Sequence, residues 1–410
     1  MKIYRLILLA IVLMLSFTGC DGNHKKSSSS TETVTKKKIV FSTNIYRKQL
    51  DQLVKDFESK NPDIKVEVEA VREPEKTFKA RLAVNELPDV TIVAEMPNNP
   101  ADYFISLDYL GNTNYDFIIP VETVLGQIYA IPIGTNYDGI IYSKLAFKDA
   151  GISKIPTSLE ELYKVCERLK AKGITPLAIS LRDKWPTKWY TTRYPVQKTG
   201  DPNYLLNLTN KDEFLTKDGA LLNILLTLRD MNQKGYLEPD VTKSTFDQMV
   251  TDIVKGKTAM TFIGSWIIPQ LIDNGAKMED IGMFPFPETK CILLCDDYTY
   301  AISKDSKDID AAKAFMKFAW EQSKISTAIG MASPFKNSKC DIETINELLS
   351  YHIPAEPLLF DSTSFCSMLE SIGTNEDDML RDFILTDNPD LLIKEYNEKW
   401  LSARKKLIDK

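Results

Sequence analysis

Neighbouring carboxylates are the first feature of this sequence that could do chemistry. Asp296 and Asp297 are adjacent, and Glu376, Asp377 and Asp378 form a second acidic run. Two carboxyl groups about 5 to 10 Å apart suffice for glycoside hydrolysis, so a secreted glycosidase is one hypothesis. No G-x-S-x-G, H-E-x-x-H or phosphate-binding loop accompanies them. Both runs are more simply interpreted as solvated turns, and we predict that the protein is not an enzyme.

Histidine and cysteine, the usual ligands of zinc, are sparse or poorly spaced. The only histidines are His24 and His352, and no C-x-x-C pair occurs. We therefore expect no metal site and no cofactor. Cys291 and Cys295 would lie about 13 Å apart along an extended strand, so they could form a disulfide only across a tight turn. Cys166 falls on the apolar face of a predicted helix, where we expect a buried thiol, and no structural disulfide is required.

Aromatic side chains outside any regular pattern are the second feature. Trp185, Trp189, Tyr190 and Tyr194 crowd into ten residues without helical or strand order, and Trp266 stands in a Gly-Ser-Trp turn. We expect the first group to lie on a loop. Exposed aromatic planes of this kind either bind a ligand or cover the edge of a core.

The first elements of the chain predict a β-α-β-α-β order. Residues 39–41 and 90–93 are typical of short buried strands, and 64–70 alternates apolar with charged residues, whereas 50–57 and 75–84 repeat at helical spacing. Such strands are parallel, and ligands gather at their carboxyl ends. Those ends carry Ser42, Thr43 and Asn44 after the first strand, and Ala94, Glu95 and Met96 after the third.

A second α/β region is predicted from about residue 134. Its strands are expected at 139–142, 176–180 and 257–263. A capping box at residues 157–160 starts a helix that ends at Gly173. Further helices are predicted at 221–234, 311–320 and 391–407. With 410 residues, of which 43% are hydrophobic, the chain is long enough for two cores.

Several stretches carry a family pattern through their order and spacing. They are 61–66 with 87–90, 128–136 with 139–144, 255–266, and 300–304 with 311–315. Together they resemble the extracellular solute-binding proteins that deliver sugars to ABC importers, the family that includes maltose-binding protein. Residues beyond about 346 match this family poorly.

The resemblance implies an α/β, periplasmic-binding-protein-like fold of two lobes joined by a multi-crossing hinge, with the ligand cleft between them. Stretch 128–144 would be the first hinge crossing and 300–315 the return. We expect lobe I to comprise 39–133 plus 296–345, and lobe II to comprise 134–295 plus 346–410. The function implied is capture of a sugar or oligosaccharide by cleft closure, followed by delivery to a membrane permease.

The same resemblance places an aromatic residue, here Trp266, against the bound sugar. A sugar ring presents C–H patches on one face and hydroxyl groups around its rim, so its site needs aromatic planes and planar polar groups. Trp185 and Trp189 are predicted to add further planes. The predicted polar contacts are Asn44, Glu95, Asn136 and Asp297. Each also has a structural interpretation, since loop aromatics cover core edges and polar residues after strands cap helices.

The expected partners follow from this function and from charge. A ligand that completes its contacts only when the lobes shut stabilises the closed form, which the transmembrane subunits of an ABC permease would recognise. The net charge of −6 and the lack of a basic block beside aromatics exclude nucleic acid. We expect a monomer. The same fold could instead bind a peptide, polyamine or phosphorylated compound, or serve as an adhesin or sensor.

The N-terminus predicts export and attachment. Lys2 and Arg5 precede an apolar run at 6–15, which is a secretory signal and too short to span a bilayer comfortably. Phe-Thr-Gly-Cys, ending at Cys20, resembles the lipobox of bacterial lipoproteins. We expect a signal peptide at 1–19, lipidation of Cys20, a flexible tether at 20–38, and anchoring on the extracytoplasmic face of the cell membrane. The alternative is an ordinary secretory signal with an incidental cysteine.

Overall fold

The computed structural model describes residues 36–45, 47–113, 116–358 and 362–408, all within one compact unit. The predicted signal peptide, Cys20 and nearly all of the predicted tether lie outside the described residues. The first strand begins at Lys37, so the last two residues assigned to the tether belong to the folded body.

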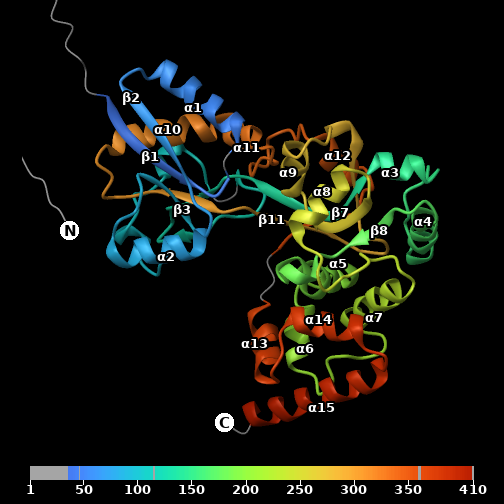
Figure 1. Ribbon diagram of the computed structural model, residues 1–410. Coiled ribbons are helices and arrows are strands. Elements are labelled where there is room, and N and C mark those ends of the chain that lie inside the picture. Colours follow the sequence, from blue (N-terminus) through green and yellow to red (C-terminus); the bar gives the residue numbers. More distant parts are fainter. Residues whose placement is uncertain (1–35, 46, 114–115, 359–361, 409–410) are drawn as a thin grey trace, which may run out of the picture. The chain divides into compact units, whose positions relative to one another are not determined.

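A mixed sheet forms the first of two lobes (Figure 1). Its strand order is β2 (Ile64–Ala70), β1 (Lys37–Thr43), β3 (Val90–Val93), β12 (Thr299–Ile302) and β6 (Ile131–Pro132). β1 runs parallel to β2 and β3, whereas β12 is antiparallel to β3 and β6. The predicted β-α-β-α-β opening is therefore confirmed, and the chain returns much later to add β12.

Helices cover both faces of this first sheet. They are α1 (Lys48–Lys60), α2 (Pro74–Val84), α10 (Ile309–Trp320) and α11 (Lys324–Ile329). On one face Phe41 of β1 packs 5.3 Å from Phe315 of α10, measured between ring centroids. On the other, Phe78 of α2 joins a smaller buried cluster with Val93. A ribbon of β4 (Thr123–Val124) and β5 (Gln127–Ile128) lies outside the sheet.

A second sheet forms the second lobe. Its order is β13 (Ala355–Pro357), β11 (Ile292–Asp296), β7 (Thr135–Ser143), β9 (Thr258–Gly264) and β8 (Thr175–Ala178), and β10 (Ile281–Phe284) also pairs with β7. Every residue of β7 is buried. This strand pairs with β9 along one edge and with β11 and then β10 along the other, so it is the centre of the lobe.

The helices of the second lobe carry its largest hydrophobic cluster. They are α3 (Lys144–Asp149), α4 (Leu159–Ala171), α5 (Tyr194–Thr199), α6 (Tyr204–Thr209), α7 (Ala220–Gln233), α8 (Phe246–Val254), α9 (Ile267–Asp273), α12 (Glu343–Leu349), α13 (Thr363–Ser371), α14 (Glu376–Leu385) and α15 (Pro389–Ile408). The N-cap of α4 is Ser158, which accepts from the backbone N–H of Glu161. The N-cap thus lies one residue later than predicted, and the Glu161 carboxylate accepts from the backbone N–H of Thr157.

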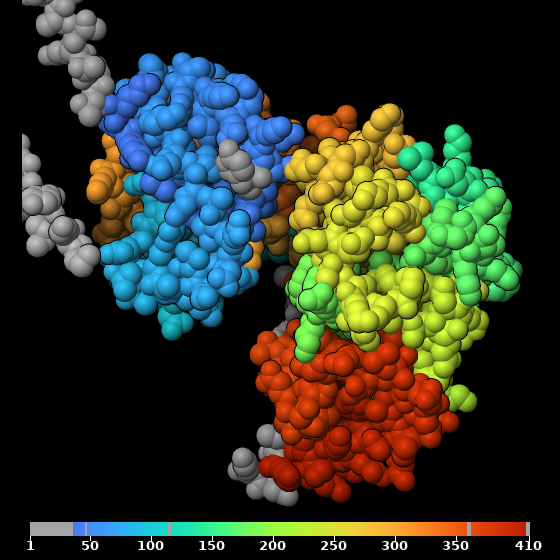
Figure 2. All heavy atoms as spheres, in the orientation of Figure 1, coloured from blue at the N-terminus to red at the C-terminus, as the bar shows by residue number. Residues whose placement is uncertain are grey.

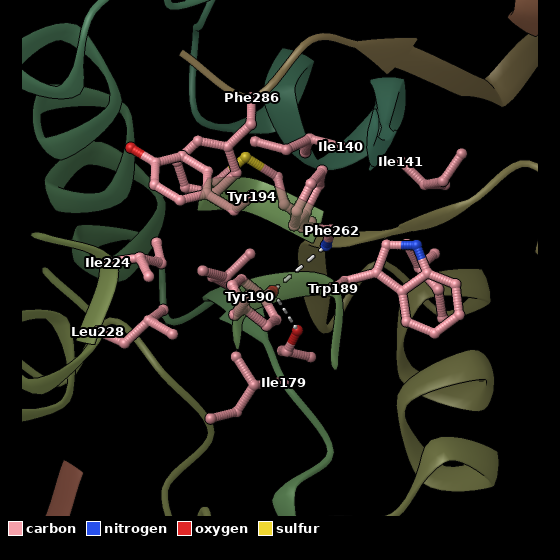
Figure 3. Close-up of a cluster of buried hydrophobic side chains, with 14 of the residues drawn as sticks. Ile140, Ile141, Ile179, Trp189, Tyr190, Tyr194, Ile224, Leu228, Phe262 and Phe286 are labelled. Atoms are coloured by element: carbon pink, nitrogen blue, oxygen red, sulfur yellow. Dashed lines mark hydrogen bonds between the residues drawn. The ribbon is translucent and has the colours of Figure 1, made fainter. Parts of the chain in front are cut away.

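The aromatic segment predicted as a loop is instead helical. A 3-10 turn at Trp185–Thr187 leads into a π-helical turn at Trp189–Arg193 and then α5. The hydroxyl of Thr192 donates to the carbonyl of Lys188, a side-chain bond that competes with the regular helical ladder. In Figure 3, Tyr190 points into the core, where its hydroxyl accepts from Phe262 N. The β-branched and aromatic residues of this turn hid its helical nature in the sequence.

The C-terminal helices belong to the second lobe, and their atoms adjoin it in Figure 2. Trp400 of α15 stacks on Phe214 with 4.2 Å between ring centroids. The acidic run that was predicted to be a solvated turn is the first turn of α14. Asn375 caps that helix, and negative charge there suits the positive end of the helix dipole.

Candidate functional site

The two lobes are joined by three crossings among the described residues. The first leads from β6 to β7, the second from β11 to β12, and the third from α11 to α12. Adjacent crossings are hydrogen-bonded, because Asp297 N donates to Gly134 O at 2.8 Å and Thr135 N donates to Ala332 O at 2.9 Å. These bonded segments form the hinge region.

The sheets and cores locate the lobe boundaries closely but not identically to the predicted ones. Asp296, predicted to open the return to lobe I, is the last residue of β11 in the second sheet. Ile345, also assigned to lobe I, packs in the cluster of the second lobe. The predicted division at 133 and 134 coincides with the link between β6 and β7.

A cavity of about 760 Å³ is lined by residues of both lobes and the hinge. In Figure 2 the surface is hollowed between the blue atoms of the first lobe and the green-to-yellow atoms of the second. The predicted site residues that line this cavity are Asn44, Asn136, Trp185, Trp189, Trp266 and Asp297. Residues far apart in the sequence therefore meet in one place.

Glu95 is the predicted site residue that the structure leaves out. Its neighbour Ala94 lines the cavity, but Glu95 does not. The carboxylate of Glu95 lies on the exposed surface, 3.0 Å from the ammonium group of Lys79. The strand end was predicted correctly, but the side chain points the other way, so we remove Glu95 from the site.

Three indole rings of the second lobe line one side of the cavity, Trp185, Trp189 and Trp266, and the Phe246 ring packs against two of them. We call these four rings the aromatic wall. The centroid of the Trp266 ring lies 5.7 Å from that of Trp185 and 5.6 Å from that of Phe246. Contacts of this kind hold the rings in fixed orientations. The wall is therefore preorganised to offer apolar planes.

The turn that presents Trp266 is held by its two preceding residues. Ser265 donates its backbone N–H to Tyr137 O, and its hydroxyl accepts from Tyr137 N. Gly264 allows the indole to fold back over the end of β9, since a Cβ there would lie 2.6 Å from the Trp266 ring. The Gly-Ser-Trp sequence thus has a steric reason, and it leaves Trp266 half-buried at the cavity.

Trp189 is placed differently from the other two indoles. It is only 4% exposed, whereas Trp185 is 38% exposed. The Trp189 N–H donates to Asp138 Oδ1 at 2.8 Å, and the guanidinium of Arg193 lies 4.6 Å from its ring centroid. The N–H and the ring of Trp189 are therefore already bound by protein groups. Its main role is to hold the neighbouring rings in place, and it offers little free surface to a ligand.

A buried ion pair lies behind the aromatic wall. Arg193 Nη1 donates to Asp138 Oδ2 at 2.9 Å, and their side chains are 11% and 0% exposed. Burial works against the charge of Arg193, but attraction to Asp138 outweighs it and raises the Arg193 pKa. Lys188 also lines the cavity, and desolvation and repulsion from Arg193 lower its pKa. The cavity therefore includes cationic groups that the sequence analysis did not assign.

Hinge residues form the polar part of the cavity, which we call the hinge floor: Asn136, Asp296 and Asp297. Asn136 Nδ2 donates to Asp297 Oδ2 at 3.2 Å, while Asn136 Oδ1 is buried without a hydrogen-bond partner. Thr135 Oγ1 donates to Asp296 Oδ1 at 2.7 Å. The interpretation of this acidic pair as a solvated turn is wrong, because the pair is partly buried at the cavity.

The electrostatics of the floor follow from this burial. Burial, with a smaller contribution from the nearby charge of Asp297, raises the pKa of Asp296 to about 7 despite the hydrogen bond from Thr135. Burial also raises the pKa of Asp297, against hydrogen bonds from Tyr298 N and Asn136. A carboxyl group that titrates near neutrality can donate or accept a hydrogen bond. The floor can therefore serve hydroxyl groups, which do both.

Several cavity residues were not singled out from the sequence. Asp296 was visible as part of an acidic pair, but Arg47, Lys188, Arg193 and Asp273 carried no motif. Within the described part of the chain, no group of three or more His, Cys, Asp or Glu could hold a metal ion. The described helices include none long and apolar enough to cross a membrane. Cys166 is a free buried thiol, as expected.

Sequence comparison identifies relatives over most of the chain. The family model described as bacterial extracellular solute-binding protein matches residues 42–320. A multiple sugar-binding protein of Streptococcus mutans is 27% identical over 340 residues, 78% of this chain and 79% of the relative. An uncharacterized ABC transporter extracellular-binding protein of Pyrococcus horikoshii is 28% identical over 339 residues, 75% and 74% of the two chains.

Solved structures share the fold. A manno-oligosaccharide-specific solute-binding protein of Bifidobacterium animalis, in complex with mannotriose, superposes with a TM-score of 0.71 at 22% identity, covering 92% of this chain and 96% of the other. The solute-binding protein RafE, in complex with raffinose, gives 0.68 at 20% identity, with 90% and 99% covered. These neighbours support the two-lobe α/β architecture. Because the family model matches more than half of the residues of this chain, the chain belongs to the bacterial extracellular solute-binding protein family.

Proposed function

We propose that this chain is the substrate-binding protein of an ABC importer for a sugar or oligosaccharide, acting by capture and release without chemical change. The observation that carries the proposal is the cavity shared by both lobes, with the aromatic wall on one side and the hinge floor on another. The relatives named as sugar-binding proteins support the same class of ligand.

The wall and floor match the two kinds of surface on a sugar. Trp266 and the more exposed Trp185 offer planes for C–H faces. Asn44, Asn136 and Asp297 offer groups that donate and accept hydrogen bonds to ring hydroxyls. Asn44 comes from the first lobe and the tryptophans from the second, so a bound guest touches both lobes at once.

Contact with both lobes gives the binding step its mechanism. A ligand that gains contacts when the lobes come together stabilises that arrangement by its differential affinity. Micromolar affinity corresponds to about 8 kcal/mol, which exceeds a closure equilibrium of a few kcal/mol. The closed, loaded form is the one that we expect the permease subunits to recognise.

The test is a screen of the full secreted chain, residues 20–410, against sugars by thermal shift, followed by calorimetry. Mannotriose, raffinose and stachyose are the first probes, with spermidine, a tripeptide and glucose 6-phosphate as other classes. A ligand at 100 times its Kd adds about 2.7 kcal/mol of stability. Saturable binding of a sugar without products in the recovered ligand is the expected result.

Three outcomes would overturn this proposal. Shortened sugars in the recovered ligand would mean a hydrolase that uses carboxylates such as Asp296 and Asp297. Binding confined to the polyamine, peptide or phosphorylated compound would keep the fold and change the cargo. No response in any class would favour an adhesin or sensor.

We further propose that Cys20 carries a lipid that holds the protein at the extracytoplasmic face of the cell membrane. The support is the lipobox-like Phe-Thr-Gly-Cys sequence after an apolar run, together with membership of an extracellular family. Cys20→Ala is expected to move the protein from the membrane fraction to the medium, and Cys366→Ala is the matched control. Retention of Cys20→Ala in the membrane fraction would contradict the lipid anchor.

A further inference from the structure

Arg47 lies where the first lobe meets the second, at the edge of the cavity. It precedes α1 and follows the loop that carries Asn44, and it lines the cavity with Asp273 of α9. The Arg47 side chain is only 8% exposed, whereas that of Asp273 is 50% exposed. A buried guanidinium that reaches from one lobe to a carboxylate of the other is unusual enough to require a role.

The contacts of Arg47 divide between the two lobes. Its Nε donates to Asp273 Oδ2 at 3.0 Å and its Nη2 to Asp273 Oδ1 at 2.7 Å, a two-point ion pair with the second lobe. Nη2 also donates to Pro269 O of the second lobe at 3.2 Å. Nη1 donates to Ile329 O of the first lobe at 2.9 Å. Arg47 is therefore fixed in its own lobe and bonded to the other.

Gly330, which ends α11 in a left-handed conformation, lies directly against this contact. It adopts φ +72°, and a Cβ at this position would lie 2.8 Å from Arg47 Nη1 and 3.0 Å from Pro269 Cγ. The first distance is shorter than real Cβ contacts and the second is tight, so a side chain here would displace the guanidinium or Pro269. A glycine here lets the guanidinium and the α9 helix approach the first lobe together.

We propose that Arg47 is a positioning residue for ligand capture. Its ion pair with Asp273, which we call the interlobe latch, holds the two lobes together around the cavity both in the empty protein and in the ligand-bound protein. This inference rests on the proposed function. Opening the lobes breaks both Arg47–Asp273 bonds and the bond to Pro269, so the latch favours the joined arrangement.

The latch gives a specific expectation for the empty protein. Ligand-free protein should populate the joined arrangement substantially, because the ion pair favours it without any sugar. Because Asp273 is half exposed, salt screens its attraction to Arg47. High ionic strength should therefore shift the empty protein toward the open arrangement. For a bound sugar, loss of the latch should raise the dissociation rate roughly tenfold.

The experiment measures the radius of gyration of the sugar-free protein by small-angle X-ray scattering at low and high salt. The variants are Arg47→Ala, and Asp273→Asn, which leaves the buried arginine in place. The matched control is Arg81→Ala, since Arg81 makes a two-point pair with Glu69 inside the first lobe. Thermal unfolding of each variant verifies that it is folded.

The expected result is a larger radius for Asp273→Asn and Arg47→Ala than for wild type, with loss of the salt response, while Arg81→Ala behaves as wild type. If Arg47→Ala does not fold, Asp273→Asn alone decides. A radius and salt response of Asp273→Asn equal to those of wild type would overturn the latch. An equal expansion in Arg81→Ala would also overturn it, as a general loss of compactness.

A second readout separates this inference from the proposed function. Dissociation of mannotriose and raffinose is measured by surface plasmon resonance for the same variants. If wild type binds neither sugar, the function is in question, but the scattering result still decides the latch. If wild type binds and Asp273→Asn releases the sugar no faster, the latch does not position the lobes for capture.

Discussion

The aromatic wall and the hinge floor are built on opposite principles. The rings of the wall pack against one another and against a buried ion pair, so its shape is set before a ligand arrives. In the floor, by contrast, Asn136 Oδ1 has no hydrogen-bond partner, and the pKa of Asp296 is raised to about 7. The comparison teaches that the aromatic side of the cavity is already packed by the protein itself, whereas the polar side retains an atom without a protein partner.

The largest expected effect tests whether the ion pair supports the wall. We expect Asp138→Ala to lower the free energy of unfolding by about 3 to 5 kcal/mol, because it leaves Arg193 buried without a counter-charge. It also removes the acceptor of the Trp189 N–H. Urea unfolding followed by circular dichroism measures this. A loss under about 1 kcal/mol would show that the wall stands without the pair.

The next effect tests the wall as a ligand surface. Trp266→Ala should weaken sugar binding by about 1 to 3 kcal/mol while the fold is retained, and Trp266→Phe should weaken it less because a ring remains. Calorimetry with a sugar from the screen gives the affinities. Unchanged affinity in Trp266→Ala would remove this residue from the site and leave the wall a structural feature.

A smaller effect tests the floor through pH. Burial raises the pKa of Asp296 to about 7 from the ordinary value of about 4, so between these values the folded state binds more protons than the unfolded state. Ionisation of Asp296 therefore lowers the free energy of unfolding as pH rises from about 4 to 7. The free energy of unfolding of Asp296→Asn, relative to that of wild type, should therefore be higher at pH 8 than at pH 5. Urea unfolding at these two pH values measures it.

The control for this prediction is Glu95→Gln, a carboxyl substitution outside the cavity. It should show no such trend relative to wild type. A pH-independent difference between Asp296→Asn and wild type would mean that the floor is as well satisfied as the wall, and the contrast between them would fail.

The smallest effect marks the limit of the site. Glu95→Ala should change sugar affinity by less than about 0.5 kcal/mol, because its carboxylate pairs with Lys79 on the exposed surface. Calorimetry under the same conditions as for Trp266→Ala measures it. A loss comparable with that of Trp266→Ala would return Glu95 to the site and extend the floor beyond the hinge.

The first lobe was the more predictable part of the fold, for a physical reason. Its strands and helices alternate over short distances, so periods of two and of 3.6 residues are visible in 64–70 and 50–57. The turn Trp189–Arg193 lacked such a signal, because its regularity comes from side-chain bonds and core contacts. The helices after 346 had no family pattern to place them.

The candidate site could be predicted where residue type alone indicates a role. Aromatic residues in unusual settings, such as Trp266, and polar residues after strands, such as Asn44, line the cavity as expected. Glu95 was misplaced because adjacent residues at a strand end point to opposite sides. Arg47 and Arg193 could not be found, since their partners Asp273 and Asp138 are distant in sequence.

The position of β12 in the first sheet has a consequence for how the protein is made. This strand lies between β3 and β6, although β7 to β11 of the second lobe precede it in the chain. During synthesis, the sheet of the first lobe cannot be completed until β12 has been made. Truncated products would leave the edges of β3 and β6 open to aggregation, so the N-terminal part of the first lobe is not a separable module.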